Sequence, residues 1–351
     1  MSAFSDAIPK QVLDAYGIEL DSAMPAASGL INRTWIVEAA SAERLVIQCL
    51  HTQIPAQVND SIRVVTGRLR DQAVCTPLLV ETCSGDTYAA VGDEIWRVLT
   101  YVPGISFDVV PDVGRAREAG GILARFHGAF IDWTDMQALP VSMVHNLPRH
   151  LGVLRTALAN GAEHDQYVRI TKLAEEILSF AQSLPQIIPN TPRIVHGDPK
   201  ISNILFDETG GAVCLVDLDT VGVMDLVWEL GDAFRSWCNP HGEDTEDTTF
   251  SLDLLHHALS GYAAYGPRFI TQQEVAGTVS ATLTIYTELA ARFCADALSE
   301  GYFAWDPVRF SSRVEHNLVR ATGQLNAAKD LAKKRIEAER IAAQIFAAQT
   351  R

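Results

Sequence analysis

One stretch in the middle of the chain, IVHGDPKISNILFDETGGAVCLVDLDTV, alternates short apolar runs with short polar ones. The apolar runs are too short for helices and are rich in β-branched residues, which is typical of strands. Turn-forming residues at 208–211 separate two of these runs, and they predict a hairpin of strands at 204–206 and 213–216. Such a hairpin brings Asn203 next to Asp217 despite their separation in the sequence. Polar side chains gathered at strand ends are typical of a site rather than of a core.

The polar residues of this stretch are the types that phosphoryl transfer from ATP requires. That reaction needs a carboxylate that accepts the proton of the acceptor hydroxyl, oxygen ligands for Mg²⁺, and a cation beside the γ-phosphate. We expect Asp198 to be the base and Lys200 to lie against the phosphate, and Asn203 and Asp217 carry the hard oxygen atoms that Mg²⁺ prefers. The alternative is that Asp198 only caps a turn that Asn203 closes. The spacing to Lys200 and the following V-D-L-D favour the chemical interpretation.

Other polar residues near this stretch favour structural roles. His196 is expected to bond to backbone, because Asp198 already fills the role of base. Asp219 has two interpretations, contact with metal or substrate and a hydrogen bond to loop backbone. A helix predicted to begin near 226 carries acids in its first turn that suit the helix dipole and can pair with an arginine further along. These residues are Asp225, Glu229, Asp232 and Arg235.

Alternating β-branched and aromatic residues in the first hundred residues predict a small antiparallel sheet. We expect a loop at 28–32 followed by strands at 34–39 and 44–49, then a helix from Val58 and three further short strands. After Pro103-Gly104, a pair that ends regular structure, the texture changes to long helical segments. The sequence therefore predicts an α+β fold with two lobes: residues 1–102 form the small sheet-bearing lobe and residues 103–351 a mainly helical lobe. The helices are expected at 111–130, 140–160, 164–184, 226–238, 249–264, 272–299 and 307–345.

Charge and composition limit the partners of the chain. A formal net charge of −15 argues against DNA or RNA, because non-specific affinity for nucleic acids comes from dense Lys and Arg. No apolar run reaches the length of a membrane span, and the N-terminus has no apolar core of a secretory signal. The six cysteines are scattered without a C-x-x-C pair, which fits reduced thiols. We therefore expect a soluble cytoplasmic protein whose partners are neither nucleic acid nor membrane, and the sequence indicates no oligomeric state.

Several motifs together resemble the aminoglycoside phosphotransferase and choline kinase superfamily, whose members are relatives of the protein kinases. HGDPKISN and VDLD resemble its catalytic and metal-binding loops, SGLINRTWIVE its phosphate-covering loop and second strand, RLVIQCLH its third strand, and WRVLTYVPG its hinge. LARFHGAF resembles the first helix of its large lobe. The pieces LINRTWIVE, DSIRVVTGRLR, ELGDAFRS, ELAARFCADAL and EHNLVRA are similar to N-acetylhexosamine 1-kinases, which phosphorylate the anomeric hydroxyl of an N-acetylated sugar with ATP and Mg²⁺.

The resemblance implies a two-lobed protein-kinase-like fold and the positions of the ligands. It places ATP under the 28–36 loop and against the hinge, and it suggests that Asp219 and Arg292 face the acceptor. The alternative for Arg292 is a structural one, pairing with a buried acid. The residues expected to bind the nucleotide are Gly29, Asn32, Arg33, Gln48, Thr100, Tyr101 and Val102. An amine-bearing acceptor, such as an aminoglycoside, choline or another amino-alcohol, is the second hypothesis for the substrate.

One departure from the protein-kinase pattern stands out. Protein kinases hold the α- and β-phosphates with a lysine on the third strand, but this chain has no lysine between Lys10 and Lys172. The strand offers neutral Gln48 instead, so Arg33 or Arg44 is expected to supply the cation. The same absence is the basis of a hypothesis of another class, a nucleotide-binding pseudokinase that regulates a partner. The intact catalytic motif argues against that hypothesis.

Overall fold

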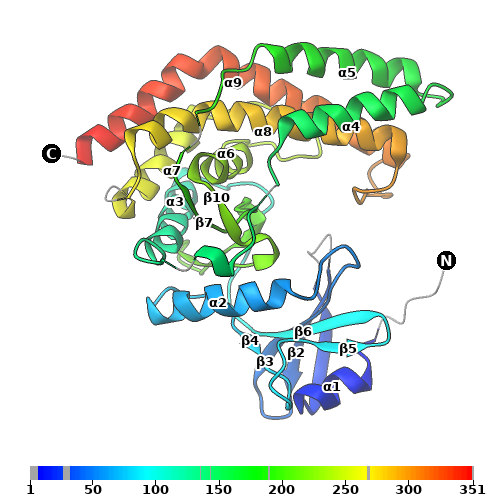
Figure 1. Ribbon diagram of the computed structural model, residues 1–351, viewed down its shortest axis with the longest axis vertical. Helices are drawn as coiled ribbons and strands as arrows, with labels where there is room; N and C mark the ends of the chain where they lie inside the picture. The colour runs from blue at the N-terminus through cyan, green and yellow to red at the C-terminus, as the bar shows by residue number, and fades with distance from the viewer. Residues whose placement is uncertain are drawn as a thin grey trace.

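A computed structural model of the protein describes residues 7–26, 32–134, 136–142, 144–188, 190–266 and 269–349. Figure 1 shows two lobes: a sheet with two helices at the bottom, and a larger, mostly helical region above it. This is the α+β, two-lobed arrangement that the sequence predicts. The chain crosses between the lobes within residues 101–104, because strand β6 ends at Thr100 and Ile105 already pairs with Phe206 in the large lobe.

The small lobe is built on a six-stranded antiparallel sheet. Five strands lie in the order β1-β2-β3-β6-β4, and β5 pairs with β6. Helix α1 packs on one face, where the rings of Trp35 and Trp96 stack at 5.5 Å between centroids. Helix α2 lies between the other face and the large lobe (Figure 1), and its buried residues join the core of the large lobe. The bounds are α1 Lys10–Tyr16, β1 Leu20–Pro25, β2 Arg33–Ala39, β3 Arg44–Cys49, α2 Val58–Asp71, β4 Leu79–Val80, β5 Ala89–Val91 and β6 Glu94–Thr100.

The large lobe combines seven helices with two short antiparallel pairs of strands among the described residues. Its helices are α3 Val113–Gly128, α4 Leu147–Asn160, α5 Tyr167–Gln182, α6 Leu226–Trp237, α7 Leu252–Tyr265, α8 Gln272–Ser299 and α9 Arg313–Gln349. The strands are β7 Pro192–Val195, which pairs with β10 Gly222–Asp225, and β8 Ile204–Phe206, which pairs with β9 Ala212–Leu215. Single 3₁₀ turns lie at Met136–Ala138, Ile201–Asn203 and Leu218–Thr220.

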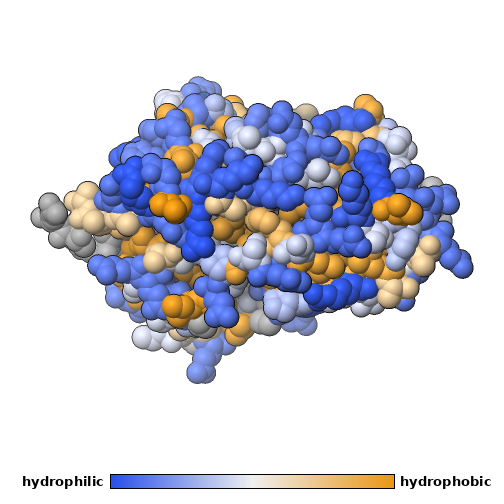
Figure 2. Space-filling view, turned by 90° about the horizontal axis from the view of Figure 1, so that it is seen from above, coloured by the Kyte–Doolittle hydropathy of each residue, from blue (hydrophilic) through white to orange (hydrophobic). Residues whose placement is uncertain are grey.

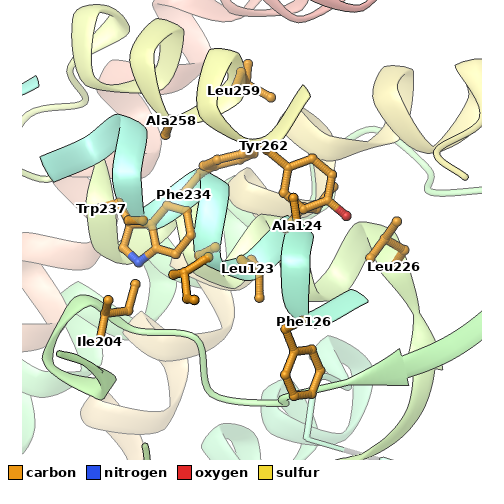
Figure 3. Close-up of a cluster of buried hydrophobic side chains, with 14 of the residues drawn as sticks. Leu123, Ala124, Phe126, Ile204, Leu226, Phe234, Trp237, Ala258, Leu259 and Tyr262 are labelled. Atoms are coloured by element: carbon orange, nitrogen blue, oxygen red, sulfur yellow. The ribbon is translucent and has the colours of Figure 1, made fainter. Parts of the chain in front are cut away.

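The core of the large lobe lies where α3, α6 and α7 meet. Leu123, Phe234 and Tyr262 are fully enclosed there (Figure 3). Burial of one such side chain stabilises a fold by about 1.5–3 kcal/mol. Helices α3 and α7 approach so closely that a Cβ on Gly120 would lie 2.0 Å from the carbonyl oxygen of Ala258. The absence of a side chain at this crossing therefore fixes how α3 sits on α7.

Most expected elements are present, with differences at their ends. The helix expected at 140–160 begins only at Leu147, because the side chain of Asn146 caps it by accepting a hydrogen bond from the backbone of Arg149. The start expected at 272 is confirmed by a capping box of Thr271 and Glu274. The last helix was expected at 307–345 and runs from 313 to 349. Strand β1 was not expected, because its side chains are exposed throughout and carry no apolar alternation.

The surface above the long helices is mainly hydrophilic. Figure 2 shows separate hydrophobic patches between hydrophilic ridges on this face. Within the part of the chain that the structure describes, none of the helices combines the length and the apolar character needed to cross a lipid bilayer.

Candidate active site

A buried carboxylate holds the loop that carries Asp198 through hydrogen bonds to its backbone. The backbone N–H groups of His196 and Gly197 donate hydrogen bonds to Glu229 of α6, at 2.8 and 2.9 Å. Glu229 is completely buried and also contacts His127 of α3 at 3.4 Å. Burial works to raise the pKa of Glu229, but His127 and the loop amide outweigh it and lower that pKa. Glu229 thus stays ionised and fixes the loop, the structural role that the sequence favours.

Two further contacts fix the path of the loop. Gly197 has φ +86°, and a Cβ there would lie 2.3 Å from the carbonyl oxygen of Thr220, so only glycine fits. The indole N–H of Trp237 donates to the carbonyl of Pro199 at 2.8 Å. These contacts tie the loop to the 3₁₀ turn Leu218–Thr220 and to α6, and neither of them uses the side chain of Asp198 or Lys200.

One oxygen of Asp198 is occupied and the other is open. Asp198 Oδ2 accepts hydrogen bonds from Lys200 Nζ at 2.7 Å and Asn203 Nδ2 at 3.1 Å. Asp198 Oδ1 makes no hydrogen bond to any described residue, and 27% of the side chain stays exposed although protein surrounds it on most sides. Burial works to raise the pKa of Asp198, but the positive charge of Lys200 outweighs it and lowers that pKa. The carboxylate is therefore ionised and presents one free acceptor.

The hairpin of β8 and β9 brings Asn203 and Asp217 together, as the sequence predicts. The backbone N–H of Val216 donates to the carbonyl of Asn203 at 2.9 Å, directly before Asp217. Asn203 Nδ2 donates to the backbone and side chain of Asp198, so Asn203 Oδ1 is left without a partner among the described residues. Asp217 has φ +64°, a left-handed conformation that is unfavourable for a residue other than glycine.

The donor set at Asn203 and Asp217 fits Mg²⁺. The carboxylate of Asp217 makes no hydrogen bond within the described residues, and the residue is exposed to solvent. Crowding by protein and the negative charges of Asp219 and Asp198 raise the pKa of Asp217, so a cation at this point would relieve the repulsion. Among the described residues, no group of three or more His, Cys, Asp or Glu side chains is placed to hold a metal ion by itself. Mg²⁺ bound with a nucleotide does not need one, because waters and phosphate oxygens complete its coordination.

The small lobe contributes a chain of polar side chains on the sheet face opposite α1. Gln48 of β3 accepts a hydrogen bond from Arg97 Nε of β6 at 2.8 Å and donates to Thr34 Oγ1 at 3.1 Å. Arg97 forms an ion pair with Asp219 of the large lobe, and Asn32 Nδ2 donates to Asp219 Oδ2 at 2.8 Å. Both oxygens of Asp219 therefore face the small lobe. This is a side-chain link between lobes, which neither sequence interpretation of Asp219 included.

The two arginines that the sequence suggested as phosphate contacts have other partners in the structure. Arg33 is on the α1 side of the sheet, the face opposite Gln48, where it pairs with Glu94 and lies beside the ring of Trp96. Arg44 shares the face of Gln48, but its guanidinium stacks on Tyr101 at 3.9 Å from the ring centroid. The structure thus brings neither arginine to Asp217. Gly29 lies outside the described residues.

The hinge residues offer backbone groups beside the sheet. The N–H of Thr100 donates to the carbonyl of Leu78 at 2.8 Å, and the N–H of Tyr101 donates to that of Arg44 at 3.4 Å. The N–H of Val102 makes no hydrogen bond within the described residues. A donor of this kind at the lobe junction is suited to a nucleotide base.

Arg292 lies in α8 beside aromatic rings. Its guanidinium lies over Tyr302 and Phe303, at 5.7 and 5.5 Å from their centroids, and it forms no ion pair among the described residues. One turn before it, fully buried Glu288 contacts His145 at 3.2 Å, while Glu288 Oε2 has no partner in the described part of the chain. Burial works to lower the pKa of His145, but Glu288 and nearby Asp232 outweigh it and raise that pKa.

Sequence reasoning missed Arg97, Glu288 and His145 as candidates. Arg97 had a detectable signal: a charge in the middle of the apolar strand EIWRVLT, on the face opposite Trp96 and Val98. Glu288 lies in the stretch ATLTIYTELAA of α8, which has no other charged residue, and could have been singled out as a buried charge. His145 had no signal, because its position depends on how the segment before α4 meets α8.

The two-lobed fold is protein-kinase-like. The chain belongs to the phosphotransferase enzyme family APH, whose sequence model matches residues 22–267. Its fold is similar to that of amicoumacin kinase hAmiN, solved with AMP-PNP, Ca²⁺ and Ami, with a TM-score of 0.63 and 15% identity over 90% of this chain and 91% of the other. The fold is also similar to that of an aminoglycoside phosphotransferase from Alicyclobacillus acidocaldarius, with a TM-score of 0.62 and 16% identity over 96% of this chain and 98% of the other. A microcompartment-associated aminopropanol kinase has a similar fold as well, with a TM-score of 0.61 and 15% identity over 94% of this chain and 97% of the other.

Proposed function

We propose that this protein is an ATP- and Mg²⁺-dependent kinase that phosphorylates a hydroxyl group of a small molecule. The observation that carries the proposal is the state of Asp198: one oxygen is held by Lys200 and Asn203, and the other is open. A carboxylate held in this way can orient a hydroxyl and accept its proton. Membership of the phosphotransferase family supports the same reaction.

Bound Mg-ATP supplies the phosphoryl group and the charge neutralisation of the reaction. Asp198 Oδ1 then holds the acceptor hydroxyl and takes its proton. Lys200 neutralises charge beside Asp198, and its pKa, which burial works to lower, is raised by Asp198 and Asp217, so it stays protonated. Asn203 and Asp217 would hold the metal. Val102, with its neighbours Thr100 and Tyr101, offers backbone groups to the adenine base of the nucleotide.

The first candidate acceptor is an N-acetylated hexosamine or a related sugar, phosphorylated at the anomeric hydroxyl. This candidate rests on the motif likeness to N-acetylhexosamine 1-kinases along most of the chain, including HGDPKISN and ELAARFCADAL.

The second candidate acceptor carries an amine, as an amino-alcohol or an aminoglycoside does. Glu288 favours it, because a fully buried carboxylate with one unpartnered oxygen suits an ammonium group. The similar structures of aminoglycoside phosphotransferases and an aminopropanol kinase point the same way.

The decisive experiment measures ADP release with Mg-ATP over a panel of N-acetylhexosamines, plain hexoses, amino-alcohols and aminoglycosides. Transfer to a sugar but not to amino-alcohols supports the first candidate, and the reverse supports the second. Binding of Mg-ATP without transfer to any member would support the pseudokinase hypothesis.

With the acceptor found, Asp198→Asn is expected to lower kcat by about 10²–10⁴-fold, the usual contribution of a general base, while ATP still binds. Asp253→Asn, whose carboxylate is 74% exposed on α7, is the matched control and should act like the wild type. Near-normal turnover of Asp198→Asn would overturn the assignment.

A further inference from the structure

Arg97 is a buried cation whose partners satisfy it poorly. Its side chain is 1% exposed, and its ion pair with Asp219 brings Nη1 to 2.5 Å from Oδ1. Yet Asp219 Oδ1 accepts no hydrogen bond from any residue that the structure describes, so the two charges meet without the alignment that a hydrogen bond requires. Arg97 donates one short hydrogen bond, from Nε to Gln48, and a long one of 3.5 Å from Nη1 to Asn59. Nη2 makes none with the residues described.

Another buried arginine of the same protein shows the difference. Arg235 donates from Nε and Nη2 to Asp232, at 3.1 and 2.8 Å, and from Nη1 to Glu243. All three of its nitrogen atoms therefore have an acidic acceptor. A buried guanidinium with a complete set of partners is structural, whereas Arg97 has a donor, Nη2, without an acceptor among the described residues.

The position of Arg97 indicates what the missing partner is. It lies directly opposite Gln48 in the pairing of β3 with β6. By the sequence resemblance, Gln48 corresponds to the strand position where protein kinases have their phosphate-binding lysine. Its ion-pair partner Asp219 is two residues from Asp217, so Arg97 reaches the loop that we assign to the metal. No lysine is available in the sequence between Lys10 and Lys172.

We infer that Arg97 binds the phosphate groups of the nucleotide and takes the place of the strand lysine. The planar guanidinium, with two N–H groups on one edge, matches two oxygens of a phosphate. The carboxylate of Asp219 is the anion that Arg97 contacts in the structure. This inference rests on the proposed function and adds to it the residue that holds the phosphates.

The test compares nucleotides with and without phosphate by calorimetry in the presence of Mg²⁺. Arg97→Gln is expected to weaken the binding of ADP by about 10–100-fold, which is the loss of charge-assisted hydrogen bonds, and to leave adenosine binding within about twofold. Arg63→Gln is the matched control, because this arginine lies on α2 with 53% of its side chain exposed. It should change neither affinity.

A purely structural Arg97 gives another pattern. Arg97→Gln would then weaken adenosine and ADP equally, and this result would overturn the inference. A selective loss of ADP binding in Arg44→Gln, with ADP binding intact in Arg97→Gln, would overturn it as well.

Arg97→Lys keeps the buried charge and serves if Arg97→Gln does not fold. It is expected to bind ADP about 3–10-fold more weakly than the wild type, because the two-pronged contact is lost, with adenosine unchanged. Unchanged ADP binding would count against a phosphate contact. If the wild type binds none of adenosine, ADP and ATP, the proposed function itself fails. This outcome is seen with the wild type alone, so it is distinct from a failure of the inference on Arg97.

Discussion

The two sides of the candidate site, the Asp198 loop and the sheet face around Arg97, are held by different kinds of contact. The loop is fixed through its own backbone, by Glu229 and Trp237 of one buried helix. The sheet face is held by side chains that bond to one another across strands and across the lobes, as Gln48, Arg97 and Asp219 do. Backbone contacts of this kind hold Asp198, the proposed general base, in position whether or not ligands are bound. Side-chain contacts can exchange a protein partner for a ligand.

The loop side gives the largest expected effect. Glu229→Ala removes a buried charge that accepts from two backbone N–H groups and contacts His127, and it should lower the free energy of unfolding by about 3–5 kcal/mol. Urea denaturation measures this loss, and turnover of the folded fraction should fall with it. Trp237→Phe, which removes one hydrogen bond to Pro199, is the milder comparison at about 1 kcal/mol. A loss below 1 kcal/mol for Glu229→Ala would mean that this carboxylate does not hold the loop.

The next effect separates steric fit from backbone conformation in the loop. Gly197 and Gly210 both have positive φ, +86° and +92° respectively. A Cβ on Gly197 would lie 2.3 Å from the carbonyl oxygen of Thr220, whereas a Cβ on Gly210 would come no closer than 3.6 Å to the side chain of Arg115. Gly210→Ala should cost about 1–2 kcal/mol for the left-handed conformation alone. Gly197→Ala should cost clearly more and should abolish turnover, because the loop must shift. Equal losses of unfolding free energy in the two variants would contradict the proposed close fit.

The sheet face gives the smallest effect on stability. Gln48→Leu leaves Arg97 Nε without its acceptor, and it should lower the free energy of unfolding by about 1–2 kcal/mol. Because Arg97 then loses its orientation, the KM for ATP should rise several-fold while kcat changes little. Gln182→Leu, at an exposed position at the end of α5, is the control. A fall in kcat at constant KM would place Gln48 with the loop rather than with the nucleotide.

The difference between the two sides also explains what the sequence could predict. Asp198, Lys200, Asn203 and Asp217 lie within one short stretch, so turn chemistry and a hairpin suffice to bring them together. The sheet face draws on strands that are far apart in the sequence, and its contacts depend on strand register. For that reason Arg33 was expected near the phosphates, while the structure turns it to the α1 side and places Arg97 beside Gln48.

The fold was predictable where local signals are strong. The capping box at Thr271 marks the start of α8, and the turn at 208–211 marks the hairpin. Strand β10 was missed because its four residues follow a 3₁₀ turn, and only pairing with β7 makes them a strand. Such pairing is a long-range event that apolar periodicity does not record.

The bridge between Ile105 and Phe206 has a mechanical consequence. These residues exchange two backbone hydrogen bonds, at 2.8 and 2.9 Å, just beyond the point where the chain leaves the sheet. Any swing of the small lobe must therefore bend residues 101–104 and pull on β8, the strand that begins next to Asn203. The bridge links the end of the hinge directly to the hairpin that we propose holds the metal. The hinge segment proposed to bind the nucleotide base and the hairpin proposed to hold the metal are thus joined by backbone hydrogen bonds, without passing through the rest of the lobe.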